Sequence, residues 1–583
     1  MKTPLLIAAL VVAVPAVALG EEDARVRLLG AMETELARSI EKLQLKEYEA
    51  PYFIAYQIKD EEVRQVSGRY GAVFSDHALR DRRLAVDVRV GSYELDNSGG
   101  DPLDMFDLAT LNSYAVRKDA PLDDDPRALR NALWLVTDEK YKAGLAAYLK
   151  KKSKRVYEVD AEERTASFSR EKPSRFIQPP EPFAWDSQRA QRIVREVGGL
   201  FKRYPEIFDS DIKVEARKEV RYFASSEGSG LVTEATMYSV HIQAVTRAVD
   251  GQLLENSRDY YAPTEAELPE LEVIKRDTAQ MISELRALRT APVIDPYTGP
   301  AILAPRAAGV LFHEVVGHRL EGDRQENDKE GRTFKGQIGR QVLPAFLSII
   351  DDPTLREMGG RPLNGFYRYD DEGVPAQRVE LVKDGKLQGF LMSRRPVKGF
   401  ASSNGHGRAQ GNRPPMSRMG NILVESARKV SYDKLKRMLV EEARRQKKPY
   451  ALIIEDISGG NTNTSSYGYQ AFKGILRLVY RVDAKTGREE LVRGVEMVGT
   501  PLTTINKVIA TGDEPGVFNG FCGAESGYVP VSAVVPAVLI SELELQRSAQ
   551  ANERPPLLPS PWAIEESEAG EGKATVPAKG NGG

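Results

Sequence analysis

This chain of 583 residues contains four residues, scarce or closely spaced, whose side chains could together activate water. His313 and His318 are two of only five histidines, Glu314 follows the first of them, and Cys522 is the only cysteine. Imidazole nitrogens and a thiolate are ligands that zinc prefers, and zinc with three protein ligands keeps a fourth position for water. These residues predict a hydrolytic zinc centre, and peptide hydrolysis is the chemistry that we expect there.

The spacing of the two histidines constrains the backbone between them. Residues five apart on an ideal α-helix point about 140° away from each other, which is too far for one ion. We predict a helix near residues 306–320 with a local π-type widening, which Gly317 would tolerate better than a residue with a Cβ. The alternative is that both histidines are core residues with satisfied hydrogen bonds, because the pattern alone is weak.

Other polar residues are candidates for supporting roles. Glu321 or Asp323 could orient a ligand imidazole, since metal-bound histidines usually donate their second nitrogen to an acceptor. His406 lies in a glycine-rich loop, where it could contact substrate, although we favour a solvent-facing loop histidine. His77 and His241 lie in strand-like segments, and we expect both to be structural.

Charge and cysteine content exclude some classes of protein. Lys plus Arg total 82 against 84 for Asp plus Glu, so there is no excess of positive charge to bind nucleic acid or an anionic membrane. One cysteine cannot form a disulfide within its own chain. Cys522 is therefore either a small buried hydrophobe or a thiolate held by a metal.

The first twenty residues have the features of a secretory signal peptide. Met1-Lys2 is a basic start, residues 5–19 are almost wholly apolar, and Ala18-Leu19-Gly20 offers the small residues that precede a cleavage site. An uncleaved anchor or a buried strand is the alternative. We expect cleavage near Gly20, export to the periplasm or the medium, and no later segment that spans a membrane.

The periodicity of apolar residues predicts an α+β fold with several domains. In residues 84–90 every second residue is apolar, as in a half-buried strand, and residues 52–58 are also strand-like. The expected helices are residues 22–45, 122–154, 182–203 and 432–445. From residue 298 onward, short apolar runs between Gly, Asp and Asn predict mixed, largely antiparallel sheets with flanking helices. These runs are residues 301–303, 377–382, 451–454 and 475–482.

Two pairs of segments resemble each other. Residues 63–68 and 91–98 are similar in type and order to residues 220–225 and 250–257. One strand-rich unit could be present twice, or common turn residues could coincide, and the sequence does not distinguish the two.

From residue 182 to residue 542, a series of short motifs resembles the TldD/PmbA family of metallopeptidases, also called modulators of DNA gyrase. No motif is specific by itself, but the set in this order is. The matching motifs are Gly299-Pro300, His313-Glu314-Val315-Val316-Gly317-His318-Arg319-Leu320-Glu321-Gly322-Asp323, Asp370-Asp371-Glu372-Gly373-Val374-Pro375, Asn404-Gly405-His406-Gly407-Arg408, Arg418-Met419, Gly459-Gly460 and Cys522-Gly523.

The resemblance implies one Zn²⁺ per chain, held by His313, His318 and Cys522, with Glu314 as the general base. All four residues place the chain on the TldD-like side, since PmbA-like subunits generally lack the metal motif. The resemblance also implies a homodimer, or a heterodimer with a PmbA-like subunit, that admits unfolded or extended peptides. The pair Gly459-Gly460 would permit a substrate backbone to approach closely.

The chain is therefore expected to be a zinc-dependent peptidase for unfolded or extended peptides. The alternative is a non-catalytic, metal-containing subunit that binds or matures peptides. The predicted organisation is a signal peptide (1–20), an N-terminal α+β extension (21–178), a TldD/PmbA-like N-terminal domain (179–297), a metallopeptidase domain (298–549) and a disordered tail (550–583). The signal peptide and the extension depart from the family pattern, and they leave substrate and partner open.

Overall fold

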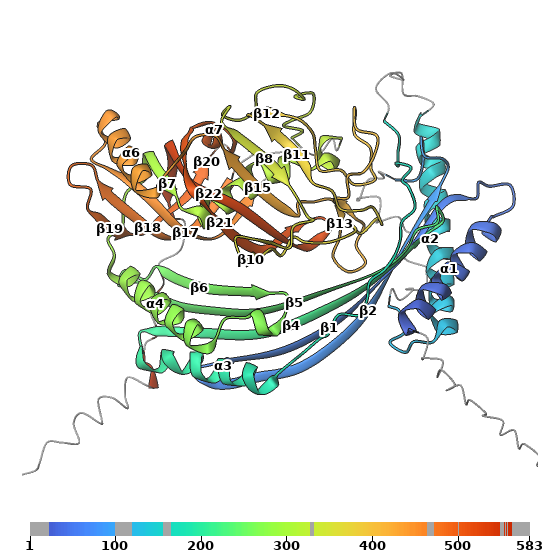
Figure 1. Cartoon of the computed structure of the whole chain (residues 1–583), viewed down its shortest axis with the longest axis horizontal. Coiled ribbons are helices and arrows are strands. Elements are labelled where there is room, and N and C mark those ends of the chain that lie inside the picture. The colour runs from blue at the N-terminus through green and yellow to red at the C-terminus, as the bar shows by residue number, and fades with distance from the viewer. Residues whose placement is uncertain are drawn as a thin grey trace, which may run out of the picture.

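The computed structural model describes residues 23–98, 119–155, 165–326, 331–462, 464, 472–499, 501–548, 553, 556 and 558–561. The predicted signal peptide and most of the predicted tail lie outside these residues. Figure 1 shows a long curved sheet and a second body, also rich in strands, that rests on its concave side. Within the described residues, no helix combines the length and the apolar character that a membrane crossing needs.

The curved sheet has six strands in the described residues, and four of them are long. Its order is β2-β1-β4-β5, and β3 and β6 share the outer edge of β5. Neighbouring strands are antiparallel except β3, which runs parallel to β5. The strands are β1 Pro51–Arg69, β2 Ala72–Val90, β3 Arg175–Ile177, β4 Ile207–Ser225, β5 Gly230–Arg247 and β6 Leu253–Ala262.

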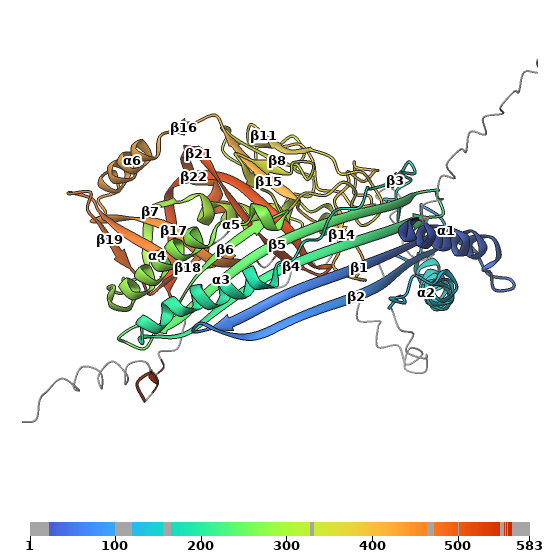
Figure 2. The ribbon, with the colours of Figure 1, turned by 60° about the horizontal axis from the view of Figure 1, so that its bottom comes forward.

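Alternation along these strands gives the sheet two different faces. In β1, Ile54, Tyr56 and Ile58 are buried beneath helices, whereas Gln57 and Lys59 contact the second body. Two helices cover one end of the outer face and two cover the other end, as Figures 1 and 2 show. The helices of this part are α1 Ala24–Lys42, α2 Pro126–Arg155, α3 Ser187–Leu200 and α4 Leu271–Thr290, with 3-10 turns at η3 Phe201–Arg203 and η4 Glu265–Glu267.

A helix, a long hairpin and a second helix occur twice along this part of the chain. The first unit is α1, β1, β2 and α2, and the second is α3, β4, β5 and α4 with β6 inserted. The similar segments 63–68 and 220–225 lie at corresponding places in β1 and β4. Because β1 pairs directly with β4, the boundary predicted between residues 178 and 179 runs through one continuous sheet.

The second body is built on a mixed, largely antiparallel sheet, as predicted. The parallel strand pairs within this sheet, among the described residues, are β15 with β22, β16 with β21 and β17 with β7. Its strands are β7 Tyr297–Leu303, β8 Leu347–Asp351, β11 Val379–Lys383, β12 Lys386–Leu387, β15 Asn421–Ser426, β16 Lys429–Val430, β17 Tyr450–Thr462, β18 Phe472–Asp483, β19 Glu489–Val492, β20 Val495–Gly499, β21 Val508–Ala524 and β22 Gly527–Arg547.

Short elements complete the second body. Two small antiparallel pairs are β9 Glu357–Met358 with β10 Arg361–Pro362, and β13 Gly407–Arg408 with β14 Met416–Ser417. The helices are α5 Pro305–Val315, α6 Tyr432–Arg445 and α7 Pro501–Asn506, with 3-10 turns at η5 Gly317–Leu320 and η6 Gly322–Gln325. The α+β class predicted from the sequence is therefore confirmed, and so is the position of the helix predicted at residues 432–445.

A buried ionic cluster joins the two bodies. Asp371 of the second body accepts from Lys59 Nζ at 2.8 Å and from Arg221 Nη1 at 2.9 Å, and these two cations lie on β1 and β4. Burial would raise the pKa of the Asp371 carboxyl, but Lys59 and Arg221 hold it well below its usual range. Asp371 therefore stays ionised and fixes the second body on the concave face.

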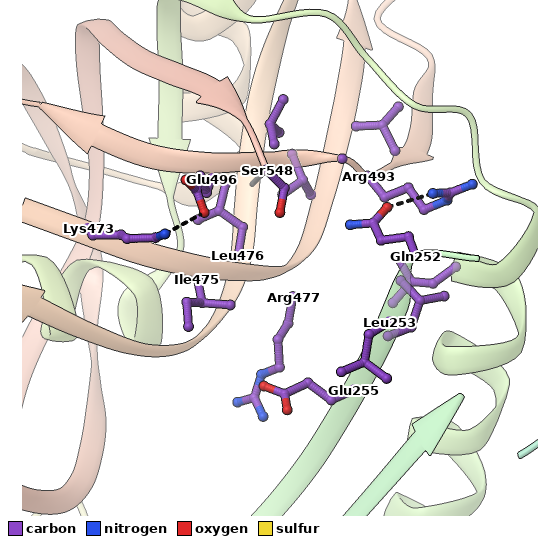
Figure 3. A pocket seen from close by; sticks show the side chains of 16 residues that line it. Gln252, Leu253, Glu255, Lys473, Ile475, Leu476, Arg477, Arg493, Glu496 and Ser548 are labelled. Carbon is purple, nitrogen blue, oxygen red and sulfur yellow. Dashed lines mark hydrogen bonds and ion pairs between the residues drawn. The ribbon is translucent and has the colours of Figure 1, made fainter. Parts of the chain in front are cut away.

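A cavity of about 290 Å³ lies at the seam between β6 and the strands β18, β19 and β20 (Figure 3). Charged side chains around it pair with each other: Lys473 lies 3.1 Å from Glu496, and Arg493 lies 3.0 Å from Asp250. None of the lining residues is one of the predicted metal ligands. The cavity is therefore separate from the candidate site.

Candidate metal centre

Helix α5 delivers the first histidine and the glutamate from inside the second body. Pro305 occupies the first turn, where its missing N–H is no loss, and nearly every later residue of the helix is buried. The α-helix ends at Val315, and η5 begins at Gly317 as a tighter 3-10 turn. The predicted π-type widening is therefore wrong, because the helix ends between the two histidines rather than expanding around them.

Gly317 has a packing role at this break. A Cβ at this position would lie 2.1 Å from Met419 Sδ and 2.9 Å from Ile422 Cδ1. Real Cβ atoms do not approach sulfur or carbon so closely, so a side chain here would push the turn away from β15 and the segment before it. The glycine is needed for close contact, and the turn that follows it directs His318 back toward His313.

The three predicted ligands meet at one point. The candidate ligand atoms of His313, His318 and Cys522 all lie within 4.8 Å of one another, and all three residues are buried. Cys522 Sγ is 3.4 Å from His318 Nε2. The two imidazole rings lie 5.2 Å apart at an angle of 85°. The structure therefore brings the three predicted ligands together in the core.

Electrostatics in the cluster favour a thiolate beside cationic imidazoles. Burial would raise the pKa of the Cys522 thiol, but the charges of His318 and His313 bring it well below its usual value. Burial would likewise lower the pKa of His318, but Cys522 and then Glu321 raise it well above the usual value. Cys522 is thus prepared as a thiolate, which is the form that binds metals.

Glu321 holds His318 in one orientation. Its Oε1 lies 3.1 Å from His318 Nδ1, which leaves Nε2 directed toward Cys522. Burial would raise the pKa of Glu321, but His318, Arg324 and Arg418 lower it to about 2. A carboxylate that accepts the second N–H of a ligand histidine is the usual support of a metal site.

Asp323, the other candidate for this role, lies elsewhere. It accepts from the Ser417 backbone N–H at 2.5 Å and from the Ser393 hydroxyl at 2.9 Å. These contacts join η6 to β14 and to the segment around Ser393. Asp323 therefore supports the loops around the site instead of an imidazole.

Glu314 lies at the edge of the cluster, with its Oε2 4.0 Å from His318 Nε2. Its side chain retains 14% exposure, so water can reach it. The carbonyl oxygens of Glu314 and Val315 accept hydrogen bonds from Arg319 Nη1 at 3.2 Å and 2.9 Å, and these bonds satisfy the last turn of α5.

The two predicted glycines on β17 have different environments. A Cβ on Gly460 would lie 2.7 Å from Glu314 Cγ and 2.9 Å from Phe472 Cε2. A Cβ on Gly459 would meet no atom within 4 Å. Gly460 therefore makes room for the Glu314 side chain, whereas Gly459 borders open space.

The remaining histidines lie apart from the cluster. His406 is fully buried, and its Nε2 lies 3.2 Å from Asp351 Oδ1, so the prediction of a solvent-facing side chain is wrong. Asp351 also accepts from the Gly420 N–H, which makes this a structural link between loops. His241 pairs with Asp259 at 2.5 Å, and His77 is exposed on β2.

The donor set fits a zinc ion. With zinc–nitrogen bonds of about 2.0–2.1 Å and zinc–sulfur bonds of about 2.3 Å, tetrahedral ligand atoms lie roughly 3.3–3.6 Å from one another. The Cys522–His318 separation of 3.4 Å is in that range. In addition, the buried Nδ1 of His313 has no hydrogen-bond partner among the described residues.

The second body is similar in sequence to proteins of one family. Residues 296–547 match the model of the PmbA/TldA metallopeptidase C-terminal domain. A metalloprotease of Archaeoglobus fulgidus is 36% identical over 234 residues, which cover 40% of this chain and 49% of that protein. A metalloprotease TldD homolog of Haemophilus influenzae is 30% identical over 282 residues, or 47% and 54% of the two chains. The chain thus spans about half the length of these two relatives.

One further relative and one solved structure extend the comparison. A zinc metalloprotease TldD homolog of Saccharolobus solfataricus is 24% identical over 356 residues, which cover 59% of this chain and 70% of that protein. The crystal structure of TldE from Thermococcus kodakarensis superposes with a TM-score of 0.58 and 13% identity, covering 88% of this chain and all of that one. Because the coverage is so large, the shared fold includes strands of the curved sheet as well as the second body.

Proposed function

We propose that this chain, whose residues 296–547 match the model of the PmbA/TldA metallopeptidase C-terminal domain, is a zinc-dependent peptidase acting on unfolded or extended peptides. The observation that carries the proposal is the buried group of His313, His318 and Cys522 with Glu314 beside it. Proteins named metalloproteases among its relatives support the same class of reaction. One zinc ion per chain is the proposed metal, and a relative named as a zinc metalloprotease supports that choice.

Glu314 and Glu321 would have different roles in the proposed hydrolysis. Zinc bound at this site would supply a Lewis acid that polarises the scissile carbonyl and makes a water molecule more acidic. Glu314 would accept a proton from the attacking water at a carboxylate oxygen and donate it to the leaving amine. Glu321 would keep the His318 ring in the tautomer that turns Nε2 toward the metal, because Nδ1 holds the proton shared with Oε1.

The substrate and the assembly are part of the proposal. An extended peptide can be held by its backbone, so we expect cleavage of unstructured chains with little dependence on sequence. We propose a dimer that shields the site, formed with a second copy or with a PmbA-like subunit. A denatured protein should then be degraded roughly tenfold faster or more than its stably folded form, because access requires local unfolding.

The test compares the parent protein with Glu314→Gln. We expect one zinc per chain by elemental analysis in both proteins, and peptide turnover lower by about a hundredfold or more in the variant. Equal turnover would exclude Glu314 as the base. If the parent holds zinc and binds peptides but releases no products, the alternative of a non-catalytic, peptide-binding subunit is correct instead.

A further inference from the structure

A fully buried arginine connects the two parts of the chain that carry His318 and Cys522. Arg418 is 0% exposed, and its Nη2 donates to the backbone carbonyl oxygen of Cys522 at 2.6 Å. Its Nη1 donates to Ser526 Oγ at 2.8 Å and to the Gly527 carbonyl oxygen at 3.0 Å. These three acceptors all belong to the hairpin of β21 and β22.

The same guanidinium faces the support of the histidine. Arg418 Nε lies 3.6 Å from Glu321 Oε1, the oxygen that also lies 3.1 Å from His318 Nδ1. Glu321 and Arg418 are both 0% exposed, so their attraction is little screened by water. Arg418 therefore contacts the backbone of Cys522 on the β21–β22 hairpin and also Glu321, the carboxylate that orients His318 of η5.

Other hydrogen bonds also hold this hairpin, since the Gln410 N–H donates to the Ser526 carbonyl oxygen and Asn519 Nδ2 donates to the Pro362 carbonyl oxygen, but neither of them reaches Cys522 or Glu321. From Pro515 to Ala524, β21 pairs only with β22 among the described residues. A second arginine, Arg324, also bridges Glu321 Oε2 and Glu525, at 2.6 Å and 2.9 Å. The Glu525 side chain is 63% exposed, however, and an exposed ion pair holds geometry weakly.

We propose that Arg418 is a positioning residue for the metal, which sets the separation of Cys522 Sγ and His318 Nε2 by holding the β21–β22 hairpin against Glu321. The proposal rests on the proposed zinc site. His318 and Cys522 are 204 residues apart in sequence, so no local structure fixes their distance. Without the guanidinium, the Cys522 carbonyl oxygen would lose the donor that links it to the Glu321 side of the site, and Glu321 would lose a neighbouring positive charge.

The first test measures zinc affinity by competition with a chelator, for the parent and for Arg418→Met. We expect affinity to fall by about tenfold or more, as removal of groups behind metal ligands commonly does. Arg418→Lys, which keeps the charge and can reach one or two of the acceptors, should recover part of the loss. With Co²⁺ in place of zinc, the thiolate-to-cobalt absorption band should weaken in the Met variant and return partly in the Lys variant.

Arg394 supplies a matched control. It is 2% exposed and contacts Glu227, the ring of Phe168 and the backbone carbonyl oxygen of Ser169, none of which belongs to the metal cluster. Arg394→Met also removes a buried cation, so it reports the general cost of that change. Its zinc affinity should stay within about threefold of the parent. An equal fall in both variants would overturn the proposal.

A second measurement separates positioning from general loosening and uses milder changes. Ser526→Ala removes one acceptor of Arg418 and should weaken zinc binding slightly without threatening the fold. In a Cys522→Ser background, Arg418→Lys should cost much less affinity than in the parent, because the ligand that it positions is gone. Fully additive effects would overturn the proposal. A parent protein that binds no zinc would overturn the proposed function itself, and with it this inference.

Discussion

At the scale of single residues, the side chain of Cys522 would be both a metal ligand and a target of oxidants. Cys522 is buried, and the charges of His318 and His313 lower the pKa of its thiol, which favours the thiolate, the form that oxidants attack. Bound metal would engage one lone pair of the sulfur together with both imidazoles. A Cys522 thiolate therefore depends on bound metal for protection against oxidation. A neutral cysteine thiol in an apolar core would not depend on metal in this way.

We predict that Cys522→Ser lowers zinc occupancy sharply while the fold is retained. The second body has a large apolar core that does not depend on one ion, in contrast to a zinc finger. Elemental analysis gives the zinc content, and circular dichroism with thermal unfolding reports the fold. Ser526→Ala, on the same hairpin but without a ligand atom, is the control and should keep most of its zinc. Full zinc retention in the Cys522 variant would remove that residue from the site.

At the scale of elements, the contact between β17 and α5 positions the proposed base. Gly460 on β17 lies so close to Glu314 that any side chain would overlap its Cγ. Val310 of α5 is also near, since its Cγ1 would lie 3.0 Å from a Cβ on Gly460. β17 therefore limits the positions that the Glu314 side chain can take. The neighbouring glycine borders open space and offers an internal comparison.

We predict that Gly460→Ala reduces peptide turnover by about tenfold or more, because even a small displacement of a reacting group is costly. Zinc content should be unchanged, since no ligand contacts Gly460 closely. Gly459→Ala should keep near-parental turnover unless a substrate backbone lies against it. Equal, near-parental turnover in the two variants would show that Glu314 tolerates displacement or is not the base.

Much of the fold and the candidate site could be predicted from the sequence, because those signals are local or depend on scarcity. Alternation in residues 84–90 identified part of β2, and scarcity singled out Cys522, which the structure brings close to His313 and His318. The break after Val315 could not be predicted, since the reason for Gly317 is a methionine about a hundred residues further along the chain. The roles of Arg418 and Asp351 were missed for the same reason: their partners lie far away in sequence.

At the scale of the whole molecule, the two bodies are joined in part by charges that are largely removed from water. Asp371, Lys59 and Arg221 are buried between the concave face and the loops near β13. Removal of one partner from such a group leaves a charge without compensation, which is costly in a low dielectric. Asp371 is thus one of several anchors of the sheet on the second body, together with Arg394, which pairs with Glu227, and Arg493, which pairs with Asp250.

We predict that Asp371→Asn destabilises the protein by roughly 3–5 kcal/mol, as expected when a buried ion pair loses one partner. The carboxyl has a lowered pKa in the folded state, so its contribution is complete above the unfolded-state pKa and is lost as pH falls toward the folded value. Denaturant unfolding at pH 7 and in the acid range measures both effects. The Asn variant should lose less stability than the parent on acidification, and parallel curves would contradict this assignment.

Export is also a property of the whole chain, and we propose it from residues 1–20. Mass spectrometry of protein recovered from its native cells should find a mature chain that begins at or near Glu21. Intact Met1 on protein in the cytoplasm would contradict the proposal.

The distance in sequence between the ligands has a consequence for synthesis of the protein. His318 is made 204 residues before Cys522, and the hairpin that carries the cysteine is the last pair of strands in the described fold. An incomplete chain therefore carries only two of the three proposed ligands. In a chain cut between His318 and Cys522, these two residues are no longer joined covalently. In the proposed function, the protein remains inert while it is being made, so the cell compartment in which synthesis occurs is not exposed to a partly built peptidase.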